Sequence, residues 1–375
     1  MKIAIINITA GGMSGGYKKY LINIIPKIAQ SPEVTSILCA SPPNLNIQNL
    51  FETQLKIKFT HYNPFSFINN NSNLKKELKN FKPDVIFIPV ERYMKFIDAP
   101  VVNMMQNMEP FIPINSNLPF IEKVKIVIQR YISKKSLKKS DHIIAISKSV
   151  SDFISSQQKI SKDKISHIYY GVNNIEKTEF NKPDLIPDSW IGNFIFTAGS
   201  IRPYRGLEDI IYSINKIPES LIKGVVIAGE STRNLSKYHN NLLKIIDKLN
   251  IQSRICWTGN LNTNELNWCY SNCCIFVVTS RIESFCMIAG EAMSHGCICI
   301  STKNPCLPEV FGNGALYYES GNIDSLSETI KQCISWNESQ KNEQSQKAKN
   351  QAQKFTWDIC SERLVKTFKN VINNF

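Results

Sequence analysis

The segment RIESFCMIAGEAM, residues 281–293, carries the clearest indication of this chain's fold and function. It places two carboxylates, Glu283 and Glu291, eight positions apart on either side of an apolar turn. On a helix, which rises about 1.5 Å per residue, the two would lie roughly 12 Å apart. A helix entrance between them favours an anion on its unpaired backbone N–H groups. These are the amides of Ser284, Phe285 and Cys286. The pattern is typical of a nucleotide-sugar site, in which the amides hold the pyrophosphate and each carboxylate binds hydroxyls.

Apolar strand-like runs alternate with helical patterns around this segment, which favours parallel βαβ units. The polar stretch 171–190, with Pro183 and Pro187, lacks an apolar period and is expected to be a linker. We predict an α/β protein with two doubly wound domains, residues 1–175 and 190–355, and ligand binding at the carboxyl ends of their strands, in the cleft between domains. The expected strands are residues 2–7, 35–39, 85–88, 101–105, 142–146 and 165–168, then 194–196, 224–228, 254–257, 275–278 and 298–301.

Length and composition bound the class of protein. The chain has 375 residues, of which 43% are hydrophobic and 20% charged, as in soluble globular proteins with two cores. No apolar run approaches the roughly 20 residues of a membrane helix. Eleven cysteines without regular spacing, in a chain with no evident secretion signal, predict reduced thiols in the cytoplasm.

The spacing of Glu283 and Glu291 resembles the Glu-x7-Glu signature of the retaining GT-B glycosyltransferases of family 4. The resemblance implies a GT-B fold with two Rossmann-like domains and a terminal helix, residues 357–375, that crosses back onto the first domain. It also implies retaining transfer from a UDP- or GDP-sugar, with no metal ion or other cofactor. Further segments that resemble the family, in the same order, are 141–147 (DHIIAIS), 168–172 (IYYGV), 196–207 (FTAGSIRPYRGL), 225–230 (VVIAGE) and 255–261 (ICWTGNL).

The resemblance assigns roles to the two carboxylates: Glu291 binds the ribose hydroxyls and Glu283 those of the transferred sugar. One position departs from the family, because Cys286 stands where a glycine is usual. Backbone approach is easiest at glycine, so we expect the thiol to crowd or reshape the sugar pocket. The other residues expected to bind the nucleotide sugar are Gly15, Gly16, Gly199, Ser284, Phe285, Met287 and Leu261.

Two arginines are the candidate cations of the site. Arg205 precedes Gly206, where the family has a lysine, and Arg202 is expected to substitute for a family arginine that would fall at Ser200. Fixed cations stabilise the charge that develops on a departing diphosphate. The sequence contains no Asp-x-Asp pair, so it gives no support for a diphosphate bridged by a metal ion.

The acceptor side is expected to include Gln106, Asn107 and Glu109, which follow the strand at 101–105. Many relatives have a histidine where Gln106 stands, so the sequence does not indicate a general base there. This departure is compatible with a front-face mechanism, in which the leaving phosphate takes the acceptor proton.

Positive charge is concentrated in the first half of the chain. Residues 1–180 carry a balance of +11 of the total +13. Within them, Val124, Val127, Ile128 and Tyr131 recur at helical spacing, and we expect this stripe to pack on the first sheet. The cations nearby are expected to dock an anionic membrane surface from the cytoplasmic side. They are Lys134, Lys135, Lys138 and Lys139.

Two alternatives to an enzyme stay open. A catalytically silent nucleotide-sugar-binding module would bind a donor without turnover. Nucleic-acid binding rests on charge alone and lacks a recognition motif, so we expect no nucleic-acid partner. The favoured function is transfer of a sugar to a glycan acceptor. The expected acceptor is a lipid-linked bacterial surface polysaccharide such as lipopolysaccharide, O-antigen or capsule.

Overall fold

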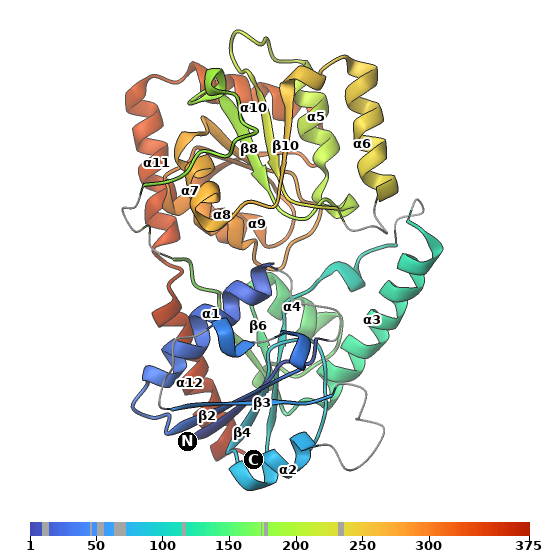
Figure 1. The fold of residues 1–375 in the computed structure, drawn as a ribbon, viewed down its shortest axis with the longest axis vertical. Helices are drawn as coiled ribbons and strands as arrows, with labels where there is room; N and C mark the ends of the chain where they lie inside the picture. The colour runs from blue at the N-terminus through green and yellow to red at the C-terminus, as the bar shows by residue number, and fades with distance from the viewer. Residues whose placement is uncertain are drawn as a thin grey trace. The chain divides into compact units, whose positions relative to one another are not determined.

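A computed structural model describes residues 1–9, 15–45, 47–50, 56–63, 73–114, 118–173, 175, 179–231 and 236–375 (Figure 1). The chain divides into two compact units. The N-terminal unit consists of Met1–Phe111, Ile126–Gly171 and Phe355–Phe375, and the C-terminal unit of Ile112–Lys125 and Val172–Lys354.

The N-terminal unit contains a parallel sheet with the strand order β3-β2-β1-β4-β5-β6-β7. Its central strands are buried along nearly their whole length, which explains why they appear in the sequence as continuous apolar runs. The strands are β1 (Lys2–Ile6), β2 (Ser36–Ser41), β3 (Ile57–His61), β4 (Val85–Ile88), β5 (Val101–Met105), β6 (His142–Ala145) and β7 (Ile165–His167).

Helices cover this sheet, and the last helix of the chain belongs to the same unit. Phe368 of that helix packs against Phe87 of β4, with ring centroids 5.2 Å apart. At its start, Trp357 packs against Tyr20, with centroids 6.0 Å apart. The helices are α1 (Gly15–Gln30), α2 (Asn73–Phe81), α3 (Phe120–Lys139), α4 (Lys148–Ser156) and α12 (Trp357–Asn373). The first six residues of α3, 120–125, belong to the C-terminal unit and the rest to this one.

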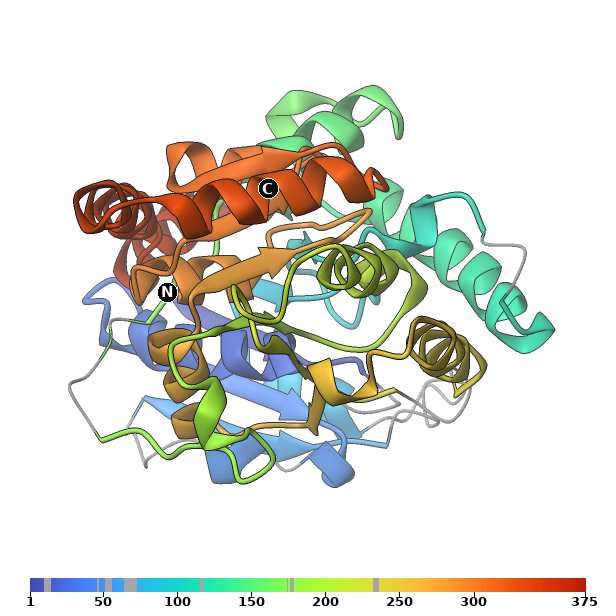
Figure 2. The same ribbon diagram turned by 90° about the horizontal axis from the view of Figure 1, so that it is seen from above.

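The C-terminal unit repeats the architecture with the strand order β10-β9-β8-β11-β12-β13, again all parallel. Helices α5 and α6 lie side by side (Figure 1 and Figure 2). The strands are β8 (Phe194–Ala198), β9 (Gly224–Ala228), β10 (Ile255–Gly259), β11 (Ile275–Val278), β12 (Cys299–Thr302) and β13 (Ala315–Tyr318). The helices are α5 (Leu207–Asn215), α6 (Ser236–Leu249), α7 (Thr263–Asn272), α8 (Met287–Ser294), α9 (Leu307–Phe311), α10 (Ile323–Ser335) and α11 (Glu338–Ala352).

The predicted fold class is confirmed, and each of the eleven predicted strands is present to within two residues at either end. Two further strands, β3 and β13, were not predicted. Both lie at a sheet edge. β3 carries Lys58, Thr60 and His61, so it lacks the continuous apolar run that marks a central strand.

The prediction that the apolar stripe of α3 packs on the first sheet is wrong. Val124, Val127, Ile128 and Tyr131 are 39%, 51%, 52% and 66% exposed. The helix instead buries a different face, which carries both small polar and apolar side chains. The buried residues of this face include Ile126, Ser133, Ser136 and Leu137. In the part of the chain that the structure describes, no helix combines the length and apolar character needed to cross a bilayer.

Candidate active site

The strand order of the C-terminal unit reverses direction between β8 and β11. Ligands of doubly wound sheets bind at the carboxyl ends of the strands beside such a switch point. The loop after β8 holds Arg202 and Arg205, and the loop after β11 holds Glu283. The topology therefore brings three predicted site residues to the edge where a ligand is expected. A small cavity of about 10 Å³ at this edge is lined by Gly199, Ser200, Arg205, Thr279, Ser280 and Ile288, among others.

Arg205 is fixed by a tight turn. The hydroxyl of Thr279 donates a hydrogen bond to the backbone oxygen of Arg205 (2.6 Å). Gly206 follows with φ +61°, and a Cβ there would lie 2.6 Å from the backbone oxygen of Thr279. Only glycine meets both demands, the left-handed φ and the close approach. The glycine after Arg205 thus holds the two loops together.

Arg205 and Glu283 form a mostly buried ion pair. Nη1 of Arg205 donates to Oε1 of Glu283, and the two side chains are 18% and 10% exposed. The Ser280 hydroxyl lies between them, 3.0 Å from Glu283 Oε1 and 3.3 Å from Arg205 Nη1. Burial opposes ionisation of Arg205, but the charge of Glu283, together with smaller contributions from Tyr204 and Cys286, raises the pKa of Arg205. A guanidinium has five N–H donors, and the buried Nε–H of Arg205 has no hydrogen-bond partner among the described residues. Arg205 can hold Glu283 and still donate to a phosphate.

A second ion pair, which the sequence analysis missed, supports the first. Arg281 binds Asp209 in a bidentate manner, with both N···O distances 2.6 Å. Asp209 also accepts hydrogen bonds from the Tyr318 hydroxyl (2.8 Å) and the Gly321 backbone N–H (3.0 Å). The backbone N–H of Arg281 donates to the carbonyl oxygen of Tyr204 (2.6 Å). This cluster ties the loop that carries Glu283 to α5 and to the turn that carries Arg205.

The backbone conformation of Cys286 gives a reason for the glycine that is usual in the family at this position. It precedes the first residue of α8 and adopts a left-handed backbone, φ +67° and ψ +70°. A side chain in this conformation costs about 1–2 kcal/mol, and glycine avoids the cost. The thiol is buried, and burial followed by the charge of Glu283 raises the pKa of Cys286, so the sulfur stays neutral. Backbone conformation thus gives a reason for a glycine here, besides the space around a bound sugar.

The helix is shorter than the sequence suggested. Helix α8 begins at Met287, and residues 283–286 lie outside any helix, so the prediction that Glu283 and Glu291 share one continuous helix is wrong. The first N–H groups of α8 belong to Met287 and Ile288, with Ser284, Phe285 and Cys286 just before them. Left-handed residues before a helix are invisible to an argument from apolar periodicity.

Glu291 lies on α8, and Glu283 lies in the loop before that helix. Its Oε2 accepts a hydrogen bond from the hydroxyl of Tyr270 (3.2 Å). Tyr270 is buried and packs edge-on against Phe196 of β8, with ring centroids 5.3 Å apart. The core of the C-terminal unit therefore positions this carboxylate. Leu261 lies in the loop between β10 and α7 and is half-buried.

In the N-terminal unit, Gly15 and Gly16 are exposed at the start of α1. Gln106 lies in the loop after β5, where both ends of its amide are hydrogen-bonded. Nε2 donates to the carbonyl oxygen of Pro89 (2.8 Å), and Oε1 accepts from the hydroxyl of Tyr170 (3.0 Å). Asn107 accepts from the backbone N–H of Glu109 through its side-chain oxygen (3.0 Å).

Glu91 organises this loop and was also missed by the sequence analysis. One of its carboxylate oxygens accepts hydrogen bonds from the backbone N–H groups of Gln106 and Asn107. Glu91 is 8% exposed, and burial raises its pKa against the effect of these two N–H donors. A glutamate after an apolar strand gives no sign in the sequence that it turns inward.

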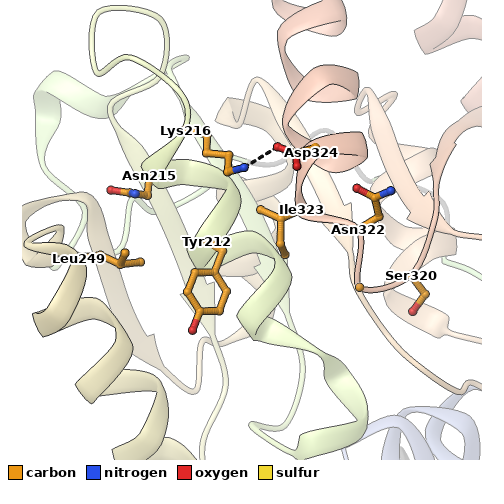
Figure 3. A pocket seen from close by; sticks show the side chains of 9 residues that line it. Tyr212, Asn215, Lys216, Leu249, Ser320, Asn322, Ile323 and Asp324 are labelled. Carbon is orange, nitrogen blue, oxygen red and sulfur yellow. Dashed lines mark hydrogen bonds and ion pairs between the residues drawn. The ribbon is translucent and has the colours of Figure 1, made fainter.

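Two other features complete the survey of sites. Among the described residues, no group of three or more His, Cys, Asp or Glu side chains gathers as metal ligands would. A larger hollow of about 780 Å³ lies at the surface of the C-terminal unit, between the end of α5 and the start of α10 (Figure 3). Its one lysine, Lys216, pairs with Asp324, and none of the predicted site residues lines it.

Comparison with sequence families shows the family to which the chain belongs. Residues 14–174 match the model of Glycosyltransferase Family 4, and residues 189–355 match that of Glycosyl transferases group 1. The chain belongs to glycosyltransferase family 4. Arg205, Glu283 and Glu291 all lie within the second match.

Curated relatives match this chain over part of their length. The O-antigen chain mannosyltransferase RfbU of Salmonella typhimurium is 26% identical over 212 residues, 56% of this chain and 55% of that protein. The serotype-specific mannosyltransferase WbdA of Escherichia coli is 20% identical over 322 residues, 79% of this chain and 38% of that protein. The chain spans about half the length of the curated relatives it matches.

Solved structures share the fold over the whole chain. A glycosyltransferase from Rickettsia africae has a TM-score of 0.71 at 17% identity and covers 100% of this chain and 99% of its own. HepE of Anabaena, in complex with UDP and glucose, has the same TM-score and identity and covers 99% of this chain and 100% of its own. The chain therefore has the GT-B fold, with two Rossmann-like units.

Proposed function

We propose that this glycosyltransferase moves a sugar from a UDP- or GDP-sugar to a glycan acceptor with retention of the anomeric configuration. The observation that carries the proposal is the buried pair of Arg205 and Glu283 at the carboxyl ends of β8 and β11. A cation held there suits a departing diphosphate, and a carboxylate beside it can accept hydrogen bonds from sugar hydroxyls. The complex of HepE with UDP and glucose supports a nucleotide-sugar donor.

In the proposed reaction, the bond between the anomeric carbon and the leaving phosphate oxygen breaks, while a bond to the acceptor oxygen forms on the same face. The acceptor proton goes to the leaving phosphate oxygen. Arg205 donates to the diphosphate through N–H groups that Glu283 does not use, and Arg202 adds a second charge. The first N–H groups of α8 hold the same phosphates. Glu291 binds the ribose.

We further propose that the acceptor is a lipid-linked bacterial surface polysaccharide and that transfer takes place at the cytoplasmic face of the membrane. The names of the relatives, O-antigen chain mannosyltransferase and lipopolysaccharide outer core galactosyltransferase, support this class of acceptor. The acceptor would approach Gln106, Asn107 and Glu109. Exposed lysines on α3 would contact anionic lipid, at about 1 kcal/mol for each basic residue near the surface. They are Lys134, Lys135, Lys138 and Lys139.

The decisive experiment combines donor binding with product analysis. A thermal-shift screen over UDP- and GDP-sugars identifies the donor, since a ligand at 100 times its dissociation constant stabilises a protein by about 2.7 kcal/mol. NMR of the product formed with that donor then gives the anomeric configuration. Retention is expected, and an inverted linkage contradicts the proposed mechanism. Donor binding without transfer or hydrolysis would favour the silent binding module instead.

Replacing Glu291 by alanine should weaken binding of the nucleoside diphosphate. Hydrogen bonds to a charged group contribute about 1.5–3 kcal/mol, so affinity should fall roughly 10- to 150-fold. Isothermal titration calorimetry with UDP and GDP measures the effect. Glu328→Ala, which removes an exposed glutamate of α10, is the matched control and should bind as the parent does. An unchanged affinity in folded Glu291→Ala removes Glu291 from the ribose site.

Activity should persist in excess EDTA, because Arg205, Arg202 and the α8 amides are proposed to take the place of a metal on the diphosphate. The initial rate with and without chelator measures this. The rate should change by less than about twofold, which corresponds to a few tenths of a kcal/mol in the activation free energy. Loss of activity that manganese or magnesium restores would contradict metal independence.

A further inference from the structure

Helix α3 presents a divided outer face, and the proposed function does not explain its apolar part. Its first three turns expose apolar side chains, which include Phe120 at 79% and Ile121 at 72% exposure. The remaining members of this apolar ridge are Val124, Val127, Ile128 and Tyr131. The last two turns expose Lys134, Lys135, Lys138 and Lys139. The helix is labelled α3 in Figure 1.

The two sets of side chains share one side of the helix. Positions 120, 124, 127, 131, 134 and 138 are separated by alternate steps of four and three residues, which places them along one line. The apolar part extends for about 17 Å, at 1.5 Å per residue. The one acidic residue of α3, Glu122, is 5% exposed and lies 3.7 Å from Lys125, so no carboxylate interrupts the outer face. The outer face is therefore apolar at one end and cationic at the other.

This combination matches an anionic lipid surface better than it matches water. Isolated exposed apolar side chains are ordinary, but six on one helical face form a patch that marks an interaction site. Helices with an apolar face and lysines beside it lie in the plane of a membrane, with the apolar side chains among the acyl chains. Tyr131, at the boundary between the apolar ridge and the lysines, is a residue type that favours the headgroup level.

We propose that the apolar ridge of α3 inserts into the headgroup and acyl boundary of an anionic bilayer, while the four lysines hold the phosphate groups. The proposal rests on the proposed membrane-side function and deepens it, because insertion differs from purely electrostatic docking. Insertion keeps the protein bound when salt screens the lysines. A purely electrostatic contact is lost at high salt, because the Debye length shortens to about 3 Å at 1 M salt.

Vesicle flotation with matched variants tests the inference. The ridge variant Val127→Asp/Ile128→Asp changes side chains that are 51% and 52% exposed, so folding should be unaffected. Its control, Ile191→Asp/Leu221→Asp, changes side chains that are 48% and 43% exposed in the C-terminal unit. Both variants add two negative charges. With phosphatidylglycerol-rich vesicles, the ridge variant should lose at least tenfold in affinity and the control less than threefold.

Two further measurements separate insertion from adsorption. In 1 M salt, the parent should keep part of its affinity, while replacement of all four lysines by glutamine should reduce affinity mainly at low salt. Phe120→Trp should shift its emission to shorter wavelength with anionic vesicles by more than the parent, which has five tryptophans of its own. Thermal melting and donor binding of each variant should equal those of the parent.

Three results would overturn the inference. They are equal loss of affinity in the ridge variant and its control, complete release of the parent by salt, and self-association of the parent that the ridge variant abolishes. The last would assign the ridge to a second copy of the chain. Failure of the proposed function is separate: a protein that binds vesicles but transfers no sugar refutes only the enzyme assignment. A protein that transfers sugar but ignores vesicles refutes only this inference.

Discussion

Replacing Arg205 by alanine should lower kcat by about 10²–10³-fold, the usual cost of removing one fixed donor to a developing negative charge. The affinity for the intact donor should change much less, because the interaction strengthens as the phosphate leaves. Steady-state kinetics with saturating acceptor, together with calorimetry of the donor, separate the two effects. A variant changed only in KM would make Arg205 a ground-state binder.

The ion pair with Glu283 complicates this variant and also makes it informative. Removing Arg205 leaves a carboxylate that is 10% exposed without its cation, which by itself disturbs a site. Glu283→Gln in the parent and in Arg205→Ala completes a double-mutant cycle that isolates the coupling between the two. Arg202→Ala is the matched control on the same loop, and its loss of kcat should be smaller, because Arg202 does not hold Glu283. Equal losses from both arginines would contradict the central role of Arg205.

The strands and the loops of the site were predictable from the sequence for a physical reason. Strands buried on both faces are mostly apolar, so β4 and β11 stand out as continuous runs. The residues after such strands meet at one edge of a sheet, and in the structure Arg205 and Glu283 both lie in loops at the carboxyl ends of strands, β8 and β11. Their direct pairing was not predicted, because spacing along the chain does not say which side chains of two loops touch.

Other features of the site depend on contacts that leave no pattern in the sequence. Asp209 lies in the first turn of α5, where any carboxylate is favoured by the helix dipole, so its four hydrogen bonds could not be foreseen. Glu91 follows a strand and turns inward to hold two backbone N–H groups. The positive φ of Cys286 could not be predicted from the sequence, because cysteine rarely adopts such a conformation.

Helix α3 shows the limit of periodicity most clearly. An apolar stripe at helical spacing predicts that one face of the helix avoids water, but it does not say what covers that face. The structure buries serines of α3 and leaves the stripe exposed. The period of the pattern correctly predicted a helix, but the prediction that the stripe packs on the first sheet was wrong. A stripe flanked by lysines fits the membrane that we propose as its covering surface.

The second large effect is expected at Asp209. Asp209→Ala should destabilise the protein by about 3 kcal/mol, because it leaves the guanidinium of Arg281 and the hydroxyl of Tyr318 without their shared acceptor. The lower part of the usual range for broken buried pairs applies, since the Arg281 side chain is 34% exposed and water reaches it. For a unit of this size, the melting temperature should fall by about 6–12 °C.

The matched control is Asp324→Ala, which breaks the exposed pair of Lys216 and Asp324, whose side chains are 46% and 74% exposed. Exposed pairs contribute about 0–1 kcal/mol, so this variant should melt within about 4 °C of the parent. Donor affinity adds a second readout. Asp209→Ala should also weaken donor binding at a temperature where the protein is still folded, because Arg281 no longer ties the Glu283 loop to the Arg205 turn. Equal melting of the two variants would show that the cluster of Arg281 and Asp209 does not stabilise the unit. Full donor affinity in Asp209→Ala would show that the cluster does not position the site.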